Sequence, residues 1–138
     1  MIAYVDSSVW LRVVLGQRDA LAEFKAIERA VISSLTEVEC LRTLDRARLR
    51  GDLDDTRLAA VREALAALLA RTEILEPNGV VLRRAAQPLP TQLGTLDAIH
   101  LVSALLWQER AGIELTFATH DQALALAARA HAMRVVGV

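Results

Sequence analysis

The sequence predicts an α/β fold: a three-layer α/β/α arrangement around a central parallel sheet of about five strands, with an αα-hairpin between the second and third strands. Two observations predict it. Short β-branched, apolar runs alternate with longer amphipathic or Ala/Leu-rich stretches, which is the pattern of parallel strands joined by crossover helices. A chain of 138 residues has the size of one domain. We therefore expect residues 1–138 to form a single domain.

The strands are expected where short runs of apolar and β-branched residues occur, at residues 2–6, 30–33, 72–75, 115–119 and 134–138. The first crossover helix is expected to start near Val9, and Asp6 or Ser7 is available as its N-cap. Helices fill the other intervals.

The interval between the second and third strands is the longest. Residues 34–50 indicate one helix, and Gly51 is expected to end it. The stretch "GDLDD" then supplies a turn with an acidic N-cap for a second helix at residues 56–70. Together the two helices form the predicted αα-hairpin.

The segment 77–95 contains all three prolines and two of the six glycines, so we expect a brief helix followed by a loop. A long helix is expected from Leu96, with Thr95 as a possible cap. The last helix runs through residues 123–132, and either Thr119 or Asp121 is available to cap it.

Composition limits the class of protein. Apolar residues make up 54% of the chain, which favours an oligomer or a complex. The net charge of −1 gives no overall attraction to nucleic acid or to a membrane. Cys40 is the single cysteine, which excludes an intrachain disulfide and fits a reducing compartment. No apolar segment approaches the length of a membrane span, so we expect a cytoplasmic protein.

An acidic residue stands where an apolar residue would be expected. The helix from Leu96 is apolar on every side, which is typical of a protein interior, yet Asp97 lies in its first turn. A buried carboxylate is costly unless a cation or a hydrogen-bond donor meets it. Asp6 and Asp121 follow the first and fourth strands, and ligands of an open parallel sheet bind beyond the carboxyl ends of its strands. Each of these two is also explained as a helix cap.

A fourth acidic residue is expected in "SSLTEVEC", where Glu37 and Glu39 are both candidates and helical periodicity does not decide between them.

Four motifs in this order, "YVDSS", "SSLTEVE", "LGTLDAIHLVSAL" and "FATHDQAL", resemble a PIN domain, and in particular the VapC-type toxin ribonucleases. The resemblance covers essentially the whole chain and implies a PIN-like fold. Its acidic positions carry over to Asp6, Glu39, Asp97 and Asp121, which leaves Glu37 solvated. The chain departs from the family pattern at Gly94, where a basic residue is frequent, and at His120, where asparagine is frequent.

Three or four carboxylates brought together cannot all remain charged without a cation. Oxygen ligands favour Mg²⁺, with Mn²⁺ possible, while the cysteine and histidines lack the spacing of a zinc site. The expected metal ligands are Asp6 and Asp97, with Glu39 binding through water or orienting the attacking water, and Asp121 as the most dispensable. Ser7 and Thr119 are expected to orient these carboxylates.

The resemblance implies that the protein hydrolyses RNA phosphodiester bonds, binds a VapB-like antitoxin and forms a homodimer. The alternative is a non-catalytic PIN-like module that binds RNA or metal without cleavage. A serine nucleophile, a nucleotide-binding loop and a phosphoacceptor receiver domain find no support, because the G-x-S-x-G, Gly-rich phosphate-binding and paired-acid motifs are absent.

Two further features remain open at the level of the sequence. His100 follows Asp97 by one helical turn and is interpreted as a core histidine bonded to a neighbour, with proton shuttling as the alternative. Arg42, Arg46 and Arg50 form a stripe that either follows an RNA backbone or is an ordinary solvated helix face.

Overall fold

The central sheet of the protein is parallel throughout. In the computed structural model, which describes residues 1–138, the strands follow the order β3-β2-β1-β4-β5. Their bounds are β1 (Ile2–Val5), β2 (Arg29–Ser33), β3 (Glu73–Leu75), β4 (Thr116–Ala118) and β5 (Arg134–Val136). The predicted five-stranded sheet is confirmed, and the strands are mostly a residue or two shorter than expected.

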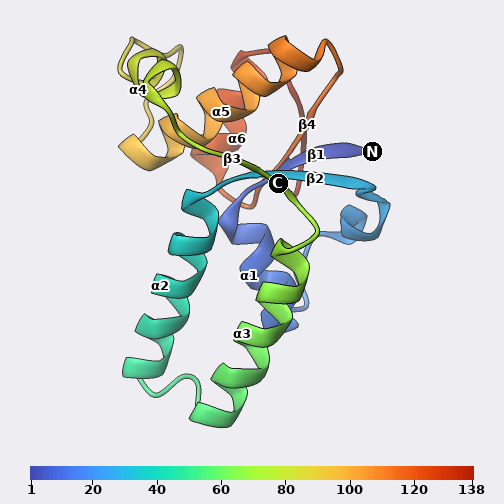
Figure 1. The fold of residues 1–138 in the computed structure, drawn as a ribbon, viewed down its shortest axis with the longest axis vertical. Coiled ribbons are helices and arrows are strands. Elements are labelled where there is room, and N and C mark those ends of the chain that lie inside the picture. Colours follow the sequence, from blue (N-terminus) through green and yellow to red (C-terminus); the bar gives the residue numbers. More distant parts are fainter.

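Six α-helices cover the two faces of this sheet. They are α1 (Ser7–Leu15), α2 (Leu35–Leu49), α3 (Asp55–Leu69), α4 (Gly79–Ala85), α5 (Thr95–Ala111) and α6 (Gln122–Ala130). Figure 1 shows α1, α2 and α3 on one side of the sheet and α4, α5 and α6 on the other, which confirms the three layers. None of the helices has the length and apolar character needed to cross a bilayer. A short 3₁₀ helix, η1 (Ala22–Ala26), was not predicted.

The alternation of side chains along β1 divides the core between these layers. Ala3 and Val5 belong to a cluster with residues of α1, α2 and α3, whereas Tyr4 belongs to a cluster with residues of α5 and α6. All three are fully buried. Successive residues of a strand point to opposite faces, so this one central strand is covered from both sides.

The predicted αα-hairpin is formed by α2 and α3, which lie side by side in Figure 1. Gly51 follows α2 with a φ of 81°, a left-handed conformation that suits glycine. Asp54 caps α3, because its side chain accepts a hydrogen bond of 2.7 Å from the amide of Arg57. Leu44 and Leu65 pack in the same cluster between the hairpin and the sheet.

Two helix starts differ from the predictions. Asp6 caps α1, which begins at Ser7 rather than near Val9. Gly94, and not Thr95, is the N-cap of α5, and its carbonyl accepts a hydrogen bond of 2.9 Å from the amide of Ala98. Asp97 is therefore the third residue of α5, in the first turn, where the helix dipole favours a negative charge.

The hairpin packing predicts a contrast within α2. Leu44→Ala should lower the free energy of unfolding by about 2–5 kcal/mol, because it leaves a cavity at a residue that is 1% exposed. Leu49→Ala, at a residue that is 71% exposed, should change it by less than about 0.5 kcal/mol. Urea unfolding of both variants measures the difference, and equal effects would contradict the packing described for α2.

Cys40 is expected to be unreactive in the native protein. Its thiol is fully buried, and burial, with the charges of Glu39 and Asp6 adding to it, raises its pKa to about 12. Because the thiolate is the reactive form, a thiol reagent at about pH 8 should label Cys40 only after unfolding. Mass spectrometry before and after adding denaturant checks this, and rapid labelling of the native protein would show that the α2 packing opens readily.

Candidate metal centre

The acidic residues that the sequence singled out come together at the carboxyl ends of β1 and β4. These two strands are neighbours in the middle of the sheet, and the chain runs outward from β1 to β2 and β3 on one side and from β4 to β5 on the other. Such a reversal of strand order opens a crevice at the strand ends. Asp6 directly follows β1, and Asp121 follows β4 by a short turn.

Asp6 is buried, with only 5% of its surface exposed, and hydroxyl donors surround one of its carboxylate oxygens. Its Oδ2 accepts hydrogen bonds from the hydroxyls of Ser8 at 2.6 Å and Thr119 at 3.0 Å, and from the amide of Ser8 at 3.3 Å. Its Oδ1 receives only a contact of 3.5 Å from Ser7. The protein thus fixes the carboxylate through Oδ2 and leaves Oδ1 with acceptor capacity for a ligand.

A tight backbone contact holds Thr119 in this position. The amide of Thr119 donates to the carbonyl of Val136 at 3.1 Å. A side chain at Gly137 would place its Cβ 2.4 Å from the Thr119 carbonyl oxygen, so only glycine allows the approach. The neighbouring His120 donates its amide to the Ser8 hydroxyl, and its Nδ1 bonds to the Gly137 carbonyl. His120 is a loop residue, as expected, and its two hydrogen bonds link Ser8, beside Asp6, to Gly137.

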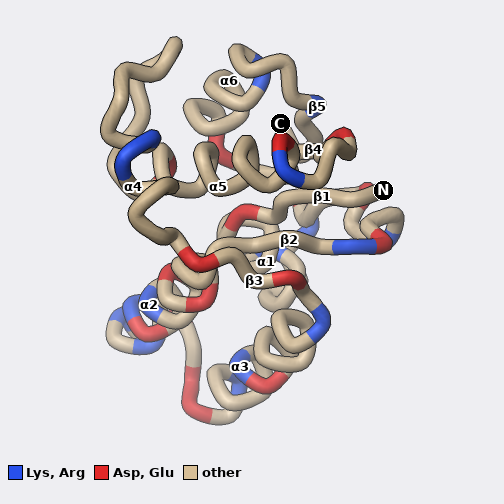
Figure 2. Tube along the Cα trace, turned by 45° about the horizontal axis from the view of Figure 1, so that its top comes forward, with Lys and Arg blue, Asp and Glu red and all other residues tan.

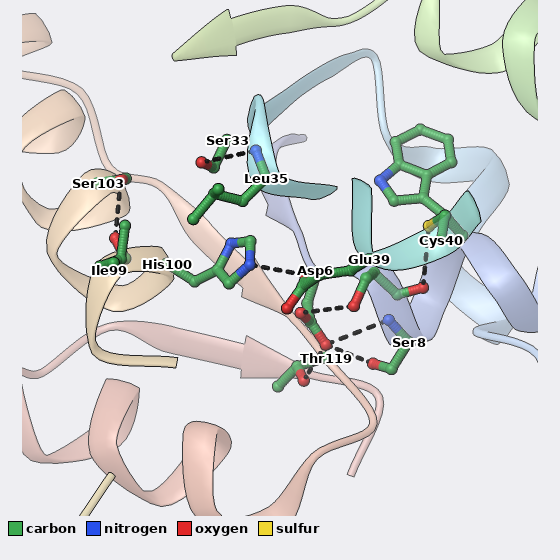
Figure 3. A network of polar contacts seen from close by, with 12 residues as sticks. Asp6, Ser8, Ser33, Leu35, Glu39, Cys40, Ile99, His100, Ser103 and Thr119 are labelled. Carbon is green, nitrogen blue, oxygen red and sulfur yellow. Dashed lines mark hydrogen bonds and ion pairs between the residues drawn. The ribbon is translucent and has the colours of Figure 1, made fainter. Parts of the chain in front are cut away.

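Glu39 reaches the same centre from α2. Its Oε2 lies 2.8 Å from Nε2 of His100 on α5, whereas Glu37 is exposed. One side-chain donor atom from each of Asp6, Glu39 and His100 lies within 4.8 Å of the others. Figure 3 shows these three side chains converging, with Ser8 and Thr119 beside Asp6.

Asp97 and Asp121 lie beside this compact group and are not part of it. Burial raises the pKa of Asp97, and the nearby charges of Asp121 and then Asp6 raise it further. Asp121 is exposed, and its side chain caps α6 by accepting a hydrogen bond of 2.8 Å from the amide of Leu124. The cap explanation therefore holds for Asp121, which also contributes negative charge near Asp97.

His100 is a fully buried histidine bonded to neighbours, as predicted. Burial alone would lower its pKa, but the hydrogen bond to Glu39 and the charges of Glu39, Asp6 and Asp97 raise it above the ordinary value. Its second ring nitrogen, Nδ1, lies 2.7 Å from the hydroxyl of Tyr4.

Sequence reasoning missed two contributors to the centre. Ser8, and not the expected Ser7, supplies the short hydroxyl bond to Asp6; its position two residues after a capping aspartate is a recognisable turn signal. Tyr4 was not singled out, although a tyrosine in a central strand needs a partner for its hydroxyl when buried. The expected role of Thr119 agrees with its bond to Asp6.

The donor set fits a divalent cation that prefers oxygen ligands. Two carboxylates lie in the compact group and two more border it, and none of Asp6, Asp97 and Asp121 pairs with an arginine. Uncompensated carboxylates in a partly buried site are the usual ligands of Mg²⁺ or Mn²⁺. Burial and the nearby charges of Asp121 and Asp6 raise the pKa of Asp97, which is what a partly buried cluster of carboxylates produces.

The arginine stripe of α2 is engaged locally. Arg42 pairs with Asp45 at 3.3 Å, and Arg46 donates to Thr43 at 2.8 Å. Arg50 pairs with Asp52 at 3.1 Å. All three arginines are exposed, and Figure 2 shows basic and acidic residues mixed along α2. These contacts agree with an ordinary solvated helix face, and the exposed guanidinium groups also leave the alternative of an RNA-binding stripe in place.

Comparison with known proteins agrees with the geometry. The family model "PIN domain" matches residues 3–130. The chain belongs to the PIN-domain family. It is 32% identical over 137 residues to "Ribonuclease VapC46" of Mycobacterium tuberculosis (strain ATCC 25618 / H37Rv), a match that covers 96% of this chain and 95% of the relative. The resemblance to VapC-type PIN domains drawn from the four motifs is therefore confirmed.

A solved structure shares the fold of this PIN domain. The crystal structure of PAE2754 from Pyrobaculum aerophilum superposes with a TM-score of 0.62 at 25% sequence identity. The match covers 97% of this chain and 83% of that chain. The three-layer arrangement is thus a known architecture.

The charge on Asp97 predicts an effect on stability. Its raised pKa means that the folded state disfavours the carboxylate, so stability is lost as the pH rises from the ordinary carboxyl value through the raised one. Asp97→Asn should therefore raise the melting temperature at neutral pH in the presence of a chelator. It should also remove most of the stabilisation that Mg²⁺ gives the unaltered protein.

Thermal unfolding with Mg²⁺ or chelator measures both effects, and Glu37→Gln, an exposed acid on α2, is the matched control. An Asp97→Asn protein that melts lower than the unaltered one, or that gains as much from Mg²⁺, would show that Asp97 does not belong to a cation site.

Proposed function

We propose that this PIN domain is a metal-dependent endoribonuclease that hydrolyses RNA phosphodiester bonds and acts as the toxin of a VapBC-type toxin–antitoxin pair. The observation that carries the proposal is the convergence of Asp6, Glu39 and His100 at the carboxyl ends of the central strands. Asp97 adds a further carboxylate beside them. A relative similar over nearly the full length of the chain is named a ribonuclease, which supports RNA as the substrate.

The hydrogen-bond partners of each acidic residue indicate its role in the proposed reaction. Asp6 would hold the cation through its less engaged oxygen, Oδ1, because Oδ2 is occupied by hydroxyl donors. Asp97, in the first turn of α5, would be a further ligand. Glu39 has one oxygen bonded to His100, so its other oxygen accepts a proton from the attacking water or binds the cation through water. Asp121 already caps α6 and is the most dispensable of the four.

The cation is Mg²⁺ or Mn²⁺. When bound, it polarises the scissile phosphate, lowers the pKa of a bound water and stabilises the leaving oxygen. The four acids would repel the RNA backbone without it, so substrate and cation bind together.

The proposed partners follow from the family. The chain binds a VapB-like antitoxin in the cytoplasm, and it forms a homodimer. Large apolar side chains remain exposed on its surface, which a partner or a second copy would cover; they include Val38, Ile74, Val80, Leu96 and Leu126.

The proposal predicts a metal-dependent cleavage that requires Asp6. Purified, partner-free protein should cut members of a pool of end-labelled short RNAs and transfer RNAs with Mg²⁺ and none with chelator. Asp6→Asn should reduce the cleavage rate at least about 100-fold, because loss of a ligand exceeds the effect of losing an outer hydrogen-bonding partner. Gel analysis of the products measures both effects.

Glu37→Gln is the control, because it removes an exposed acid two residues from Glu39 and should leave cleavage unchanged. Binding of the cation and of RNA without any cleavage would refute the enzyme and support the non-catalytic module instead. Equal cleavage by the Asp6→Asn protein would show that the activity comes from elsewhere.

A further inference from the structure

We propose that His100, held by Tyr4, is a positioning residue that fixes the carboxylate of Glu39 in the metal centre and is not itself a metal ligand. The inference rests on the proposed nuclease function and adds a role for two residues outside the acidic set. It is carried by a chain of two short hydrogen bonds that crosses the protein from β1 through α5 to α2.

The chain of contacts joins three elements that each carry an acidic residue of the centre. The Tyr4 hydroxyl lies 2.7 Å from Nδ1 of His100, and Nε2 of His100 lies 2.8 Å from Oε2 of Glu39. Tyr4 lies on β1, two residues before Asp6, which directly follows that strand, and His100 is one helical turn after Asp97 on α5. One imidazole therefore links the positions of Asp6, Asp97 and Glu39.

The chemistry of the partners assigns the protons. A carboxylate only accepts hydrogen bonds, so the proton between His100 and Glu39 belongs to Nε2. In the neutral ring Nδ1 then accepts from the Tyr4 hydroxyl, and in the protonated ring Nδ1 donates to the same oxygen, so Nε2 carries its proton toward Glu39 in both forms. A nitrogen that carries a proton has no lone pair for a metal, so Nε2 serves Glu39 and not the cation.

Packing immobilises Tyr4 and His100, the first two members of this series of hydrogen bonds. Tyr4 and His100 are both fully buried. The Tyr4 ring stacks on Phe117 with a centroid distance of 5.2 Å and an interplanar angle of 23°, and it meets the His100 ring edge-on at 6.0 Å. His100 consequently has one orientation, and it presents Nε2–H at one place.

Glu39, at the other end of the series, needs such a fixed hydrogen-bond donor. The side chain of Glu39 is 22% exposed, and a free glutamate on a helix surface samples several rotamers, whose loss costs free energy on ordering. Glu37, on the same helix without such a partner, is exposed. The bond from His100 turns Glu39 toward Asp6 in advance and commits Oε2, which leaves Oε1 for the water or the cation.

The test separates positioning from packing by a double-mutant cycle. His100→Leu keeps the volume and removes the donor, His100→Gln keeps an amide donor at a similar reach, and Tyr4→Phe removes only the hydroxyl that orients the ring. We expect His100→Leu to lower kcat for RNA cleavage by roughly 10- to 100-fold with little change in KM, and His100→Gln to recover part of the loss. Tyr4→Phe should give a smaller loss.

The decisive combination is with Glu39→Gln. If His100 acts through Glu39, the protein carrying both Glu39→Gln and His100→Leu should be no less active than Glu39→Gln alone. Melting temperatures control for folding, and the partly conservative Tyr4→Phe and His100→Gln proteins keep the test available if His100→Leu unfolds. Losses that multiply in the combined variant, or a fall in melting temperature without a fall in kcat, would overturn the positioning role.

Two spectroscopic measurements do not depend on cleavage. NMR of protein with ¹⁵N-labelled histidine should show His100 protonated at Nε2 and bonded at Nδ1, and Glu39→Gln should shift the Nε2 proton. Pulsed electron paramagnetic resonance of bound Mn²⁺ should lack the ¹⁴N coupling of a coordinated imidazole; its presence would make His100 a ligand and overturn the proposal. If the unaltered protein cleaves no RNA while these signatures hold, the nuclease function fails and the positioning of Glu39 by His100 stands.

Discussion

The burial of one carboxylate, that of Asp6, is the constraint on which the rest of the centre depends. An ionised group that is 5% exposed is stable only if donors replace its lost water. The donors are the hydroxyls of Ser8, from the first turn of α1, and Thr119, from the end of β4. Ser8 reaches Asp6 locally, whereas Thr119 reaches it because β1 and β4 are adjacent in the sheet. Gly137 lets the ends of β4 and β5 approach closely at Thr119.

A second constraint acts across the layers. The helices on the two faces of the sheet have separate main cores, and a small apolar cluster, in which Leu35 of α2 packs against Ile99 and Val102 of α5, joins the two layers near the strand ends. The bond between Glu39 of α2 and His100 of α5 joins the two layers there, and Tyr4 ties it to the central strand. Polar contacts between elements far apart in the sequence therefore act together with apolar packing to set the geometry of the acids.

The sequence predicted the parts of this arrangement that depend on local order. Alternating runs gave the sheet and the hairpin, and the position of Asp6 and Asp121 after strands placed them at one edge. Glu39 could be separated from Glu37 only through the family resemblance, because both suit an amphipathic helix. The cap of α5 was misplaced at Thr95, since a glycine in extended conformation also starts a helix. The contact of Tyr4 with His100 joins segments far apart in the sequence through tertiary geometry, which no spacing rule specifies.

Charge balance explains why such a site needs a cation. Surface acids such as Asp45 and Asp52 are paired with arginines, but Asp6, Asp97 and Asp121 have no such partner, and the imidazole of His100 is engaged by Glu39. The folded protein therefore gathers acidic side chains at the strand ends without pairing them with arginine, and burial together with the charges of Asp121 and Asp6 raises the pKa of Asp97. In the proposed nuclease the divalent ion removes this charge and admits an RNA phosphate at the same time, so metal binding and substrate binding are coupled through the same unpaired carboxylates.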